Sequence, residues 1–132
     1  MESEELKVVR AFIEAINRQD VTALSALMAD DHVFVDSVGT VESDREAMVP
    51  GWRQYFSMFP DFRIEVESTF QQGSRLAVFG SWSATYAGKD GPVPDNAVGG
   101  PAAWQAVVEG GKVKFWQVYA DHTKTWQVIN RS

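Results

Sequence analysis

Arg63-Ile-Glu-Val-Glu-Ser-Thr-Phe70 decides the fold, because the hydrophobic pattern of the chain changes its period at this stretch. Ile64, Val66 and Phe70 alternate with charged and polar residues, and a period of two predicts a half-buried β-strand. Before this stretch apolar residues recur at helical spacing, and after it strand patterns dominate. Helices followed by strands predict an α+β domain, with the helices packed on one face of a mostly antiparallel sheet.

Upstream of this stretch the pattern predicts three helices and one strand. The first helix begins after the N-cap Ser3, and Asp20 caps a shorter second helix that extends to Met28. A capping box at residues 43–46 starts the third helix, and Phe59-Pro-Asp61 stops it. Residues 32–36 are rich in Val and Phe, which predicts a short strand ending in a turn.

Downstream, residues 75–87 predict a long strand. Residues 88–101 contain four Gly and three Pro, so we expect a loop there that forms a rim or a lid. Residues 102–108 and 112–120 then predict a hairpin that turns at Glu109-Gly110-Gly111.

The composition is that of one folded domain covering residues 1–132. Hydrophobic residues make up 45% of the chain and charged residues 23%, close to the globular average. The absence of cysteine excludes disulfides and a thiol nucleophile.

The charge pattern argues against nucleic-acid and membrane partners. The net charge is −6, and the 12 Lys and Arg residues are scattered rather than clustered against phosphates. No apolar run approaches the roughly 20 residues of a membrane span. The acidic residues after Met1 differ from the basic start of a signal peptide, so we expect a cytoplasmic protein.

Two sets of motifs resemble known families. The segments Val8–Asp20, Met28–Asp31 and Val35–Gly39 resemble the opening of ketosteroid isomerases. The segments Phe59-Pro-Asp-Phe-Arg-Ile-Glu-Val66 and Gly111-Lys-Val-Lys-Phe-Trp-Gln-Val-Tyr-Ala-Asp121 resemble SnoaL-like polyketide cyclases. Both groups belong to the nuclear transport factor 2-like superfamily. The resemblance implies a cone in which a curved sheet and N-terminal helices enclose a pocket. It also implies a homodimer and no metal or organic cofactor.

Asp36 and Asp121 are candidate catalytic residues. Alternation places Asp36 on one face of its strand with His32 and Phe34, where it could act as a general base, or it could form an Asx-turn. The resemblance matches Asp36 to the proton-abstracting Asp of the isomerases. It matches Asp121 to the acid/base Asp of the cyclases, although Asp121 could instead cap a C-terminal turn.

Two histidines complete the chemical candidates. His32 could orient or protonate a substrate, or make a single structural hydrogen bond. We expect His122 to point to solvent. A metal site of His32, Asp36, Asp121 and His122 is conceivable, but their spacing does not require one, so none is predicted.

Aromatic side chains are predicted to form the walls of the pocket. The predicted substrate-binding residues are Phe12, Phe34, Trp52, Tyr55, Trp82, Trp104, Trp116 and Tyr119. Tyr119 lies at an odd position and the strand tryptophans at even ones, so they share a cavity only if a bulge resets the register. The isomerase Tyr falls on Phe12 here and the second isomerase Asp near Trp104, so the donor pair of that enzyme is not reproduced.

These features favour a cofactor-free acid/base enzyme acting on a small hydrophobic carbonyl compound, of polyketide cyclase-, isomerase- or dehydratase-like type. The expected ligand is a small hydrophobic or polycyclic molecule. The alternative is a non-catalytic module that binds small molecules or associates with proteins. Epoxide hydrolysis is a third option, but it needs an Arg bridging two acids, and we find none at the matching strand positions.

Overall fold

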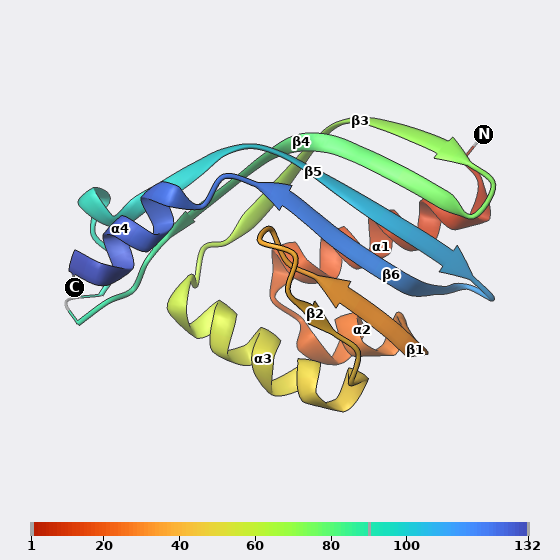
Figure 1. The fold of residues 1–132 in the computed structure, drawn as a ribbon, viewed down its shortest axis with the longest axis horizontal. Helices are drawn as coiled ribbons and strands as arrows, with labels where there is room; N and C mark the ends of the chain where they lie inside the picture. Colours follow the sequence, from red (N-terminus) through yellow and green to blue (C-terminus); the bar gives the residue numbers. More distant parts are fainter. Residues whose placement is uncertain (1, 90, 132) are drawn as a thin grey trace.

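The computed structural model describes residues 2–89 and 91–131, which form helices on a curved sheet (Figure 1). The helices are α1 (Glu4–Arg18), α2 (Val21–Ala26), α3 (Arg45–Met58) and α4 (Thr123–Arg131), with a short 3-10 turn, η1 (Pro94–Asn96). The strands are β1 (Met28–Val35), β2 (Val41–Glu42), β3 (Arg63–Gln72), β4 (Arg75–Thr85), β5 (Ala97–Glu109) and β6 (Lys112–Ala120).

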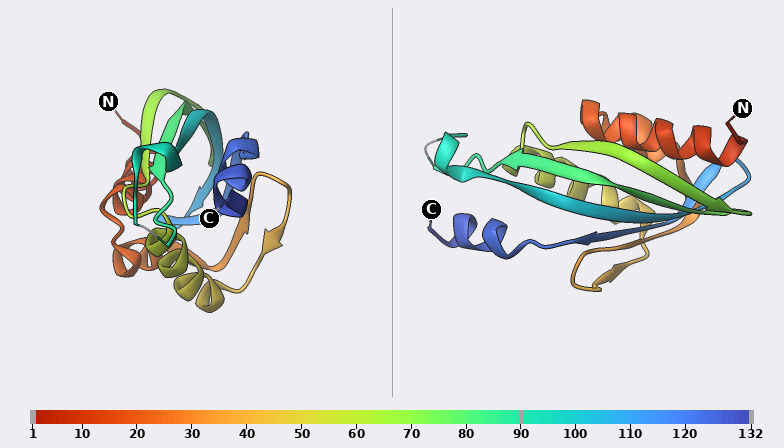
Figure 2. Two further views of the ribbon diagram at one scale, coloured as in Figure 1. Left: turned by 90° about the vertical axis from the view of Figure 1, so that its left-hand side faces the viewer. Right: turned by 90° about the horizontal axis from the view of Figure 1, so that it is seen from above.

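The strands form one mixed sheet in the order β2-β1-β6-β5-β4-β3. β1 runs parallel to β6, and the other neighbouring pairs are antiparallel. The sheet is strongly curved, with α1 against the inside of the curve and α3 beneath it (Figure 2). This is the α+β cone that the sequence and its resemblance predict.

Helix α1 supplies much of the core. The Ser3 hydroxyl accepts a hydrogen bond from the Leu6 N–H at 3.0 Å, as expected for the N-cap. The stripe that includes Val9, Phe12 and Ile16 is fully buried, and α1 packs against β3, β5 and β6. The helical period of the sequence therefore places the apolar face of α1 inside the curve of the sheet.

Two element boundaries differ from the prediction. The second helix ends at Ala26 and Met28 already belongs to β1, so the first strand is longer than residues 32–36. The N-cap of α3 is Asp44 rather than Ser43, because the Asp44 carboxylate accepts the Glu46 N–H at 3.0 Å. Strand β2, which pairs with β1, was not predicted.

The predicted loop at residues 88–101 is also too long, because β5 begins at Ala97. Pro101 fits within β5 because it pairs with Ser81 of β4, whereas pairing with β6 starts only at Ala102. Here β5 has one neighbour, so the missing N–H of proline need not leave a ladder bond unmade.

Helix α4 follows β6 and stands at one end of the molecule (Figure 1). Its Arg131 guanidinium donates to the Asp95 carbonyl at 2.7 Å, which ties the helix to η1. In the described part of the chain, no helix combines the length and the apolar character needed to cross a membrane.

Candidate functional site: an aromatic cavity

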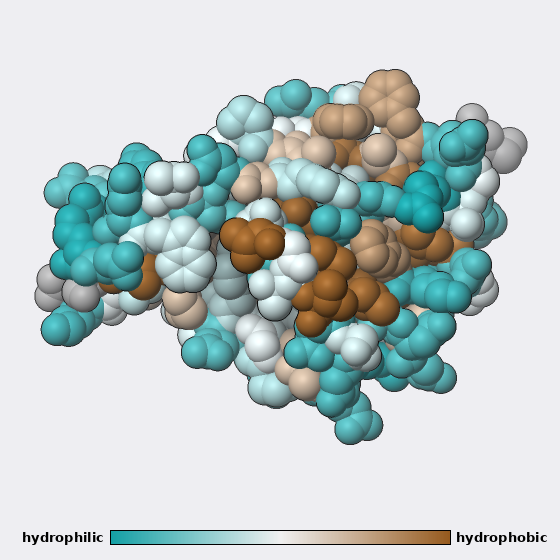
Figure 3. All heavy atoms as spheres, viewed as in Figure 1, coloured by the Kyte–Doolittle hydropathy of each residue, from teal (hydrophilic) through white to brown (hydrophobic). Residues whose placement is uncertain are grey.

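A cavity of about 500 Å³ opens between the inner face of the sheet, α3, α4 and the turn after β1. Figure 3 shows a recess in this region, between α4 and the apolar side chains at the centre of the face. The curved sheet provides the floor and the two helices provide the sides. The structure therefore places a cavity where the cone was expected to hold one.

Most of the predicted wall residues do line this cavity. They are Phe34, Trp52, Tyr55, Trp82, Trp104 and Trp116. The three sheet tryptophans among them are at most 4% exposed. Phe59, Phe62 and Trp126 also line the cavity and were not predicted. The position of Phe59 directly after α3, at helical spacing from Tyr55, could have suggested it. Trp126 gave no signal because only a short turn was expected where α4 lies.

Phe12 and Tyr119 are not among the lining residues. Phe12 is fully buried, with ring centroids 4.8 Å from Trp116 and 6.0 Å from His32, so it supports the wall from behind. Tyr119 is 47% exposed, and its hydroxyl donates to Gln105 Oε1 at 3.1 Å. Alternation along β6 thus places Tyr119 on the opposite face of the sheet from Trp116.

Asp36 forms the turn that the sequence allowed and also borders the cavity, while its role as a general base stays a prediction. Its Oδ1 accepts hydrogen bonds from the N–H groups of Val38 at 3.0 Å and Thr40 at 2.9 Å, so it does form the turn after β1. The half-buried side chain also lines the cavity. Because both of these bonds use Oδ1, Oδ2 is left for other contacts.

Asp121 is exposed and lies outside the cavity lining. Its Oδ1 accepts the Thr123 N–H at 2.9 Å, so the carboxylate occupies the N-terminus of α4. Hydrogen bonds from the side chain and backbone of Thr123 lower the pKa of Asp121. This is the capping arrangement, and a direct catalytic contact by Asp121 stays a prediction.

His122 lines the cavity rather than facing solvent as predicted. Its ring lies 4.7 Å from the ring of Trp82, and its Nδ1 lies 3.3 Å from the Thr125 hydroxyl. Burial lowers the pKa of His122, and the nearby charges of Asp121 and Asp36 partly oppose this shift. A half-buried, neutral imidazole thus sits within the electrostatic reach of Asp36.

His32 is fully buried and does not line the cavity. Its Nδ1 lies 2.6 Å from the Val113 carbonyl oxygen, which can only accept, so Nδ1 carries the proton. Burial is the main cause that lowers the pKa of His32, and its Nε2 has no hydrogen-bond partner among the described residues. His32 shares the inner face with Phe34 as predicted, but it lies behind Phe12, beyond the reach of the cavity.

Tyr55 contributes a polar group that the sequence reading treated only as part of the wall. The ring packs between aromatic neighbours, with centroids 5.0 Å from Phe59 and 5.3 Å from Phe62. Burial raises the pKa of Tyr55, so the phenol stays protonated at neutral pH. A protonated phenol in an apolar wall can donate a hydrogen bond to a ligand oxygen.

The described residues do not bring together the metal site that the sequence left conceivable. No group of three His, Cys, Asp or Glu side chains in residues 2–89 and 91–131 could hold a metal ion. His32 in particular is separated from the cavity that Asp36 lines. No Arg occurs among the described residues that line the cavity.

Comparison with known proteins agrees with this architecture. The SnoaL-like domain family matches residues 9–118, so the chain belongs to that family. No protein with a curated description matches the chain in sequence.

Solved structures show the same fold at low sequence identity. A proposed SnoaL-like polyketide cyclase from Shewanella denitrificans is 15% identical with a TM-score of 0.83, and the match covers 99% of this chain and 100% of that one. A protein with a ketosteroid isomerase-like fold from Catenulispora acidiphila, in complex with trimethylamine, is 18% identical with a TM-score of 0.79, over 93% and 92%. TerC, co-crystallised with polyporic acid, is 14% identical with a TM-score of 0.79, over 97% and 99%.

Proposed function

We propose that this protein is a cofactor-free acid/base enzyme acting on a small hydrophobic carbonyl compound, in the manner of a polyketide cyclase, isomerase or dehydratase. The observation that carries this proposal is that Asp36, His122 and Tyr55 all border one aromatic cavity. A carboxylate, a neutral imidazole and a protonated phenol supply a base, a proton carrier and a hydrogen-bond donor. Membership of the SnoaL-like family, and relatives crystallised with small molecules, support it.

Asp36 is the proposed general base. In this step Oδ2 takes a proton from the carbon next to the substrate carbonyl. The C–H bond breaks, an O–H bond forms on Asp36, and the electron pair moves onto the carbonyl oxygen. The two backbone N–H groups that bind Oδ1 hold the carboxylate in place, which keeps the base correctly oriented.

Tyr55 is the proposed donor to the enolate oxygen that this step creates. Donors aimed at a developing oxyanion in a water-poor site are among the strongest contributors to catalysis. Phe12 cannot take this part, because it has no hydroxyl and lies behind the wall. The Trp82 indole N–H is buried without a hydrogen-bond partner among the described residues, and it could provide a second donor after a small rearrangement.

His122 is the proposed proton relay: its neutral ring takes the proton from the newly formed Asp36 carboxylic acid, and the resulting imidazolium returns it to carbon or to a new alkoxide, so both groups end in their starting forms. Asp121 would act through His122 as a positioning residue, because its charge favours the imidazolium form. His32 would support the wall without touching the substrate. Of the three catalytic candidates predicted from the sequence, Asp36 is thus proposed to act on the substrate, Asp121 to act through His122, and His32 to support the wall.

The alternative is a binding module without turnover. The observation in its favour is that both predicted acids already have structural tasks, Asp36 in the turn after β1 and Asp121 at the start of α4. Such a module would bind the same hydrophobic ligands. Only a measurement of proton transfer separates the two functions.

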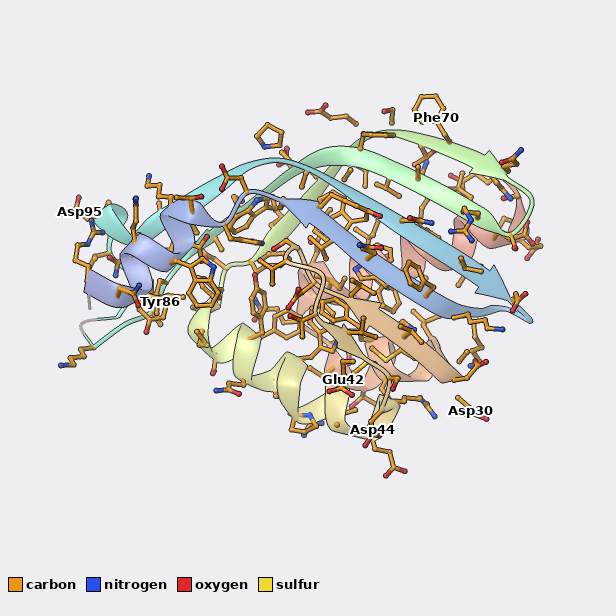
Figure 4. All side chains as sticks on the ribbon, in the orientation of Figure 1. Asp30, Glu42, Asp44, Phe70, Tyr86 and Asp95 are labelled. Atoms are coloured by element: carbon orange, nitrogen blue, oxygen red, sulfur yellow. The ribbon has the colours of Figure 1, made fainter. Side chains whose placement is uncertain are left out.

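We also propose a homodimer. Phe70, Phe79 and Tyr119 are exposed, and the rings of Phe70 and Phe79 meet edge to face. Figure 4 shows Phe70 projecting away from the sheet. Exposed aromatic residues of this kind are common at interfaces between chains. A cytoplasmic location stays a prediction.

Hydrogen–deuterium exchange at carbon tests the proposed reaction without knowledge of the final product. Polycyclic ketones are incubated with the protein in D2O, and the loss of the α-C–H signal is followed by NMR. We expect catalysed exchange with the wild-type protein and a loss of at least about a hundredfold in D36N, since a general base typically contributes that much. Asn keeps an oxygen for the two backbone bonds, so the turn is preserved.

Glu67→Gln is the matched control, because it removes one exposed carboxylate of β3 outside the cavity lining. It should exchange at the wild-type rate. Exchange at the same rate in D36N would refute the role of Asp36. Saturable binding of the ketones with no exchange in any variant would favour the non-catalytic module.

A further inference from the structure

The charged groups around the cavity are all of one sign. Asp36 and Glu42 line it, and no described lining residue is Lys or Arg. Glu42 lies beside the first turn of α3 (Figure 4), where its Oε1 accepts the Asp44 N–H at 2.8 Å. The nearby Arg45 donates instead to the Ser25 carbonyl at 3.0 Å and to Asp30 at 3.3 Å. Among the described residues that line the cavity, no Lys or Arg therefore offsets the two carboxylates.

The other sources of positive charge are also unavailable. Burial keeps His122 in its neutral form at neutral pH, because it lowers the pKa of the imidazole. The N-terminus of α4, which begins right after His122, could attract an anion, but the Asp121 carboxylate already accepts the Thr123 N–H there. The site thus presents two carboxylates, and the hydrogen bonds that they accept come from neutral backbone N–H groups.

The aromatic walls of the cavity, like its two carboxylates, favour a positively charged ligand. Trp52, Trp82 and Trp126 line the cavity, and Trp126 is 56% exposed at its rim. The face of an indole ring attracts a cation, and Trp is the side chain that does so best. An ammonium group near the rim would meet both the indole faces and the carboxylates of Asp36 and Glu42.

We propose that the cavity selects its ligands by charge, so that a polycyclic molecule carrying a basic amine binds most tightly, a neutral one less tightly and a carboxylate least. The apolar body of the ligand would occupy the tryptophan-lined interior, and the amine would lie at the rim between Asp36 and Glu42. This inference rests on the proposed use of the cavity as a ligand site and names the substrate class within it.

Three naphthalene derivatives of equal shape test the proposal: 2-naphthylmethylamine, 2-naphthylmethanol and 2-naphthoate. Their dissociation constants are measured by calorimetry at pH 7.5 and two salt concentrations. We expect the amine to bind more tightly than the carboxylate by about tenfold or more, with the affinity of the alcohol between them. High salt should reduce the difference in affinity between the amine and the carboxylate. Equal affinities, or tighter binding of the carboxylate, would overturn the proposal.

Variants locate the cause of the preference. D36N and E42Q together should bring the amine and the carboxylate to within about threefold of one another, because both carboxylates are gone. Each replacement keeps an oxygen for the backbone bonds that the acid accepts. E67Q is the control and should leave the preference intact. An unchanged preference in the double variant would also overturn the proposal.

The outcomes separate this inference from the proposed function. If none of the three molecules binds, the ligand site itself is refuted. If all three bind with equal affinity, the cavity stands as a hydrophobic site and only the charge selection is refuted.

Discussion

Tyr55 and His122 are polar groups in the mainly apolar lining of the cavity, and burial shifts the pKa of each. It raises the pKa of the Tyr55 phenol and lowers that of the His122 imidazole, so both groups are neutral at neutral pH. A neutral phenol and a neutral imidazole can form hydrogen bonds with a ligand without the desolvation cost of a resting charge in the cavity.

Replacing Tyr55 by Phe tests the proposed donor. We expect kcat for α-proton exchange to fall about 10²–10³-fold, as when one oxyanion donor is removed. Ligand affinity should change little, because the aromatic ring remains. Tyr86→Phe is the matched control: Tyr86 is half-buried, its ring packs 5.7 Å from Phe59, and it lies outside the cavity lining. Equal rates in both variants would contradict the role of Tyr55.

The two histidines should make stability depend on pH. Their pKa values are lowered from the ordinary 6.5 by burial, so below pH 6.5 the unfolded chain binds more protons than the folded one. The contribution of the two neutral histidines to the free energy of unfolding is therefore fully present above pH 6.5. It is lost as the pH falls below that value, by up to about 1.4 kcal/mol per histidine for each pH unit.

Urea unfolding at pH 7.5 and pH 5.5 measures this loss. The double variant H32N/H122Q should show a smaller difference between the two conditions than the wild-type protein. The lower pH stays well above 3.8, the ordinary value from which the Asp121 pKa is lowered, so that group does not contribute. An identical pH difference in the double variant would show that the histidines are not the cause.

At the scale of single residues, the sequence predicted which residue types form the cavity better than it predicted where individual side chains point. Alternation separated Trp116 from Tyr119 in the sequence, and in the structure Trp116 lines the cavity whereas Tyr119 does not, because strand periodicity is a local property. It could not place His122, since the residue follows the end of β6, where the period no longer applies. His32 lies outside the cavity lining because Phe12, from a helix distant in the sequence, packs against it.

The strands of the curved sheet depend on two glycines at close approaches. A Cβ atom at Gly80 would collide with the backbone carbonyl of Glu65, and one at Gly99 would collide with that of Trp82. Gly80 lies where the pairing of β3 with β4 shifts register, between Val66 and Ser68. Such bulges bend a sheet, so these positions shape the floor of the cavity.

Gly80→Ala is therefore expected to destabilise the protein by roughly 1–3 kcal/mol, because backbone atoms must move to admit the methyl group. Gly51→Ala is the control in α3, where a Cβ would meet nothing within 4 Å. It should be neutral or stabilise the protein by roughly 0.5–1 kcal/mol. Chemical denaturation of the two variants provides the comparison, and equal stabilities would contradict the account of Gly80.

At the scale of elements, caps and hydrophobic periods are local signals, and they predicted the helices and strands that they start or define. The caps Ser3 and Asp20 and the change of period at Arg63 predicted helices and strands that the structure confirms. The register shift in β3 and the two-residue strand β2 depend on pairing with distant segments, for which the sequence carries no local pattern. The glycines of residues 88–101 suggested a loop, yet Gly99 serves strand packing.

The exposed aromatic residues on the outer face of the sheet lead to a prediction of the oligomeric state. If Phe70, Phe79 and Tyr119 form the proposed dimer contact, light scattering should give twice the 14.7 kDa mass of one chain. Phe79→Glu should then yield monomers, because a charge at the centre of an apolar contact is costly. Val41→Glu, at an exposed position of β2, is the control and should leave the mass unchanged. A monomeric wild-type protein would contradict the proposed dimer.

Catalysis and charge selection both require that the cavity takes up a hydrophobic ligand. All five tryptophans of the chain line this cavity, so their fluorescence reports on its occupancy with little background. The decisive measurement is a titration of this fluorescence with polycyclic ketones, corrected with free N-acetyltryptophanamide. We expect a saturable change at one ligand per chain. A linear response identical to that of the free tryptophan compound, for every ketone, would contradict the assignment of the cavity as the functional site.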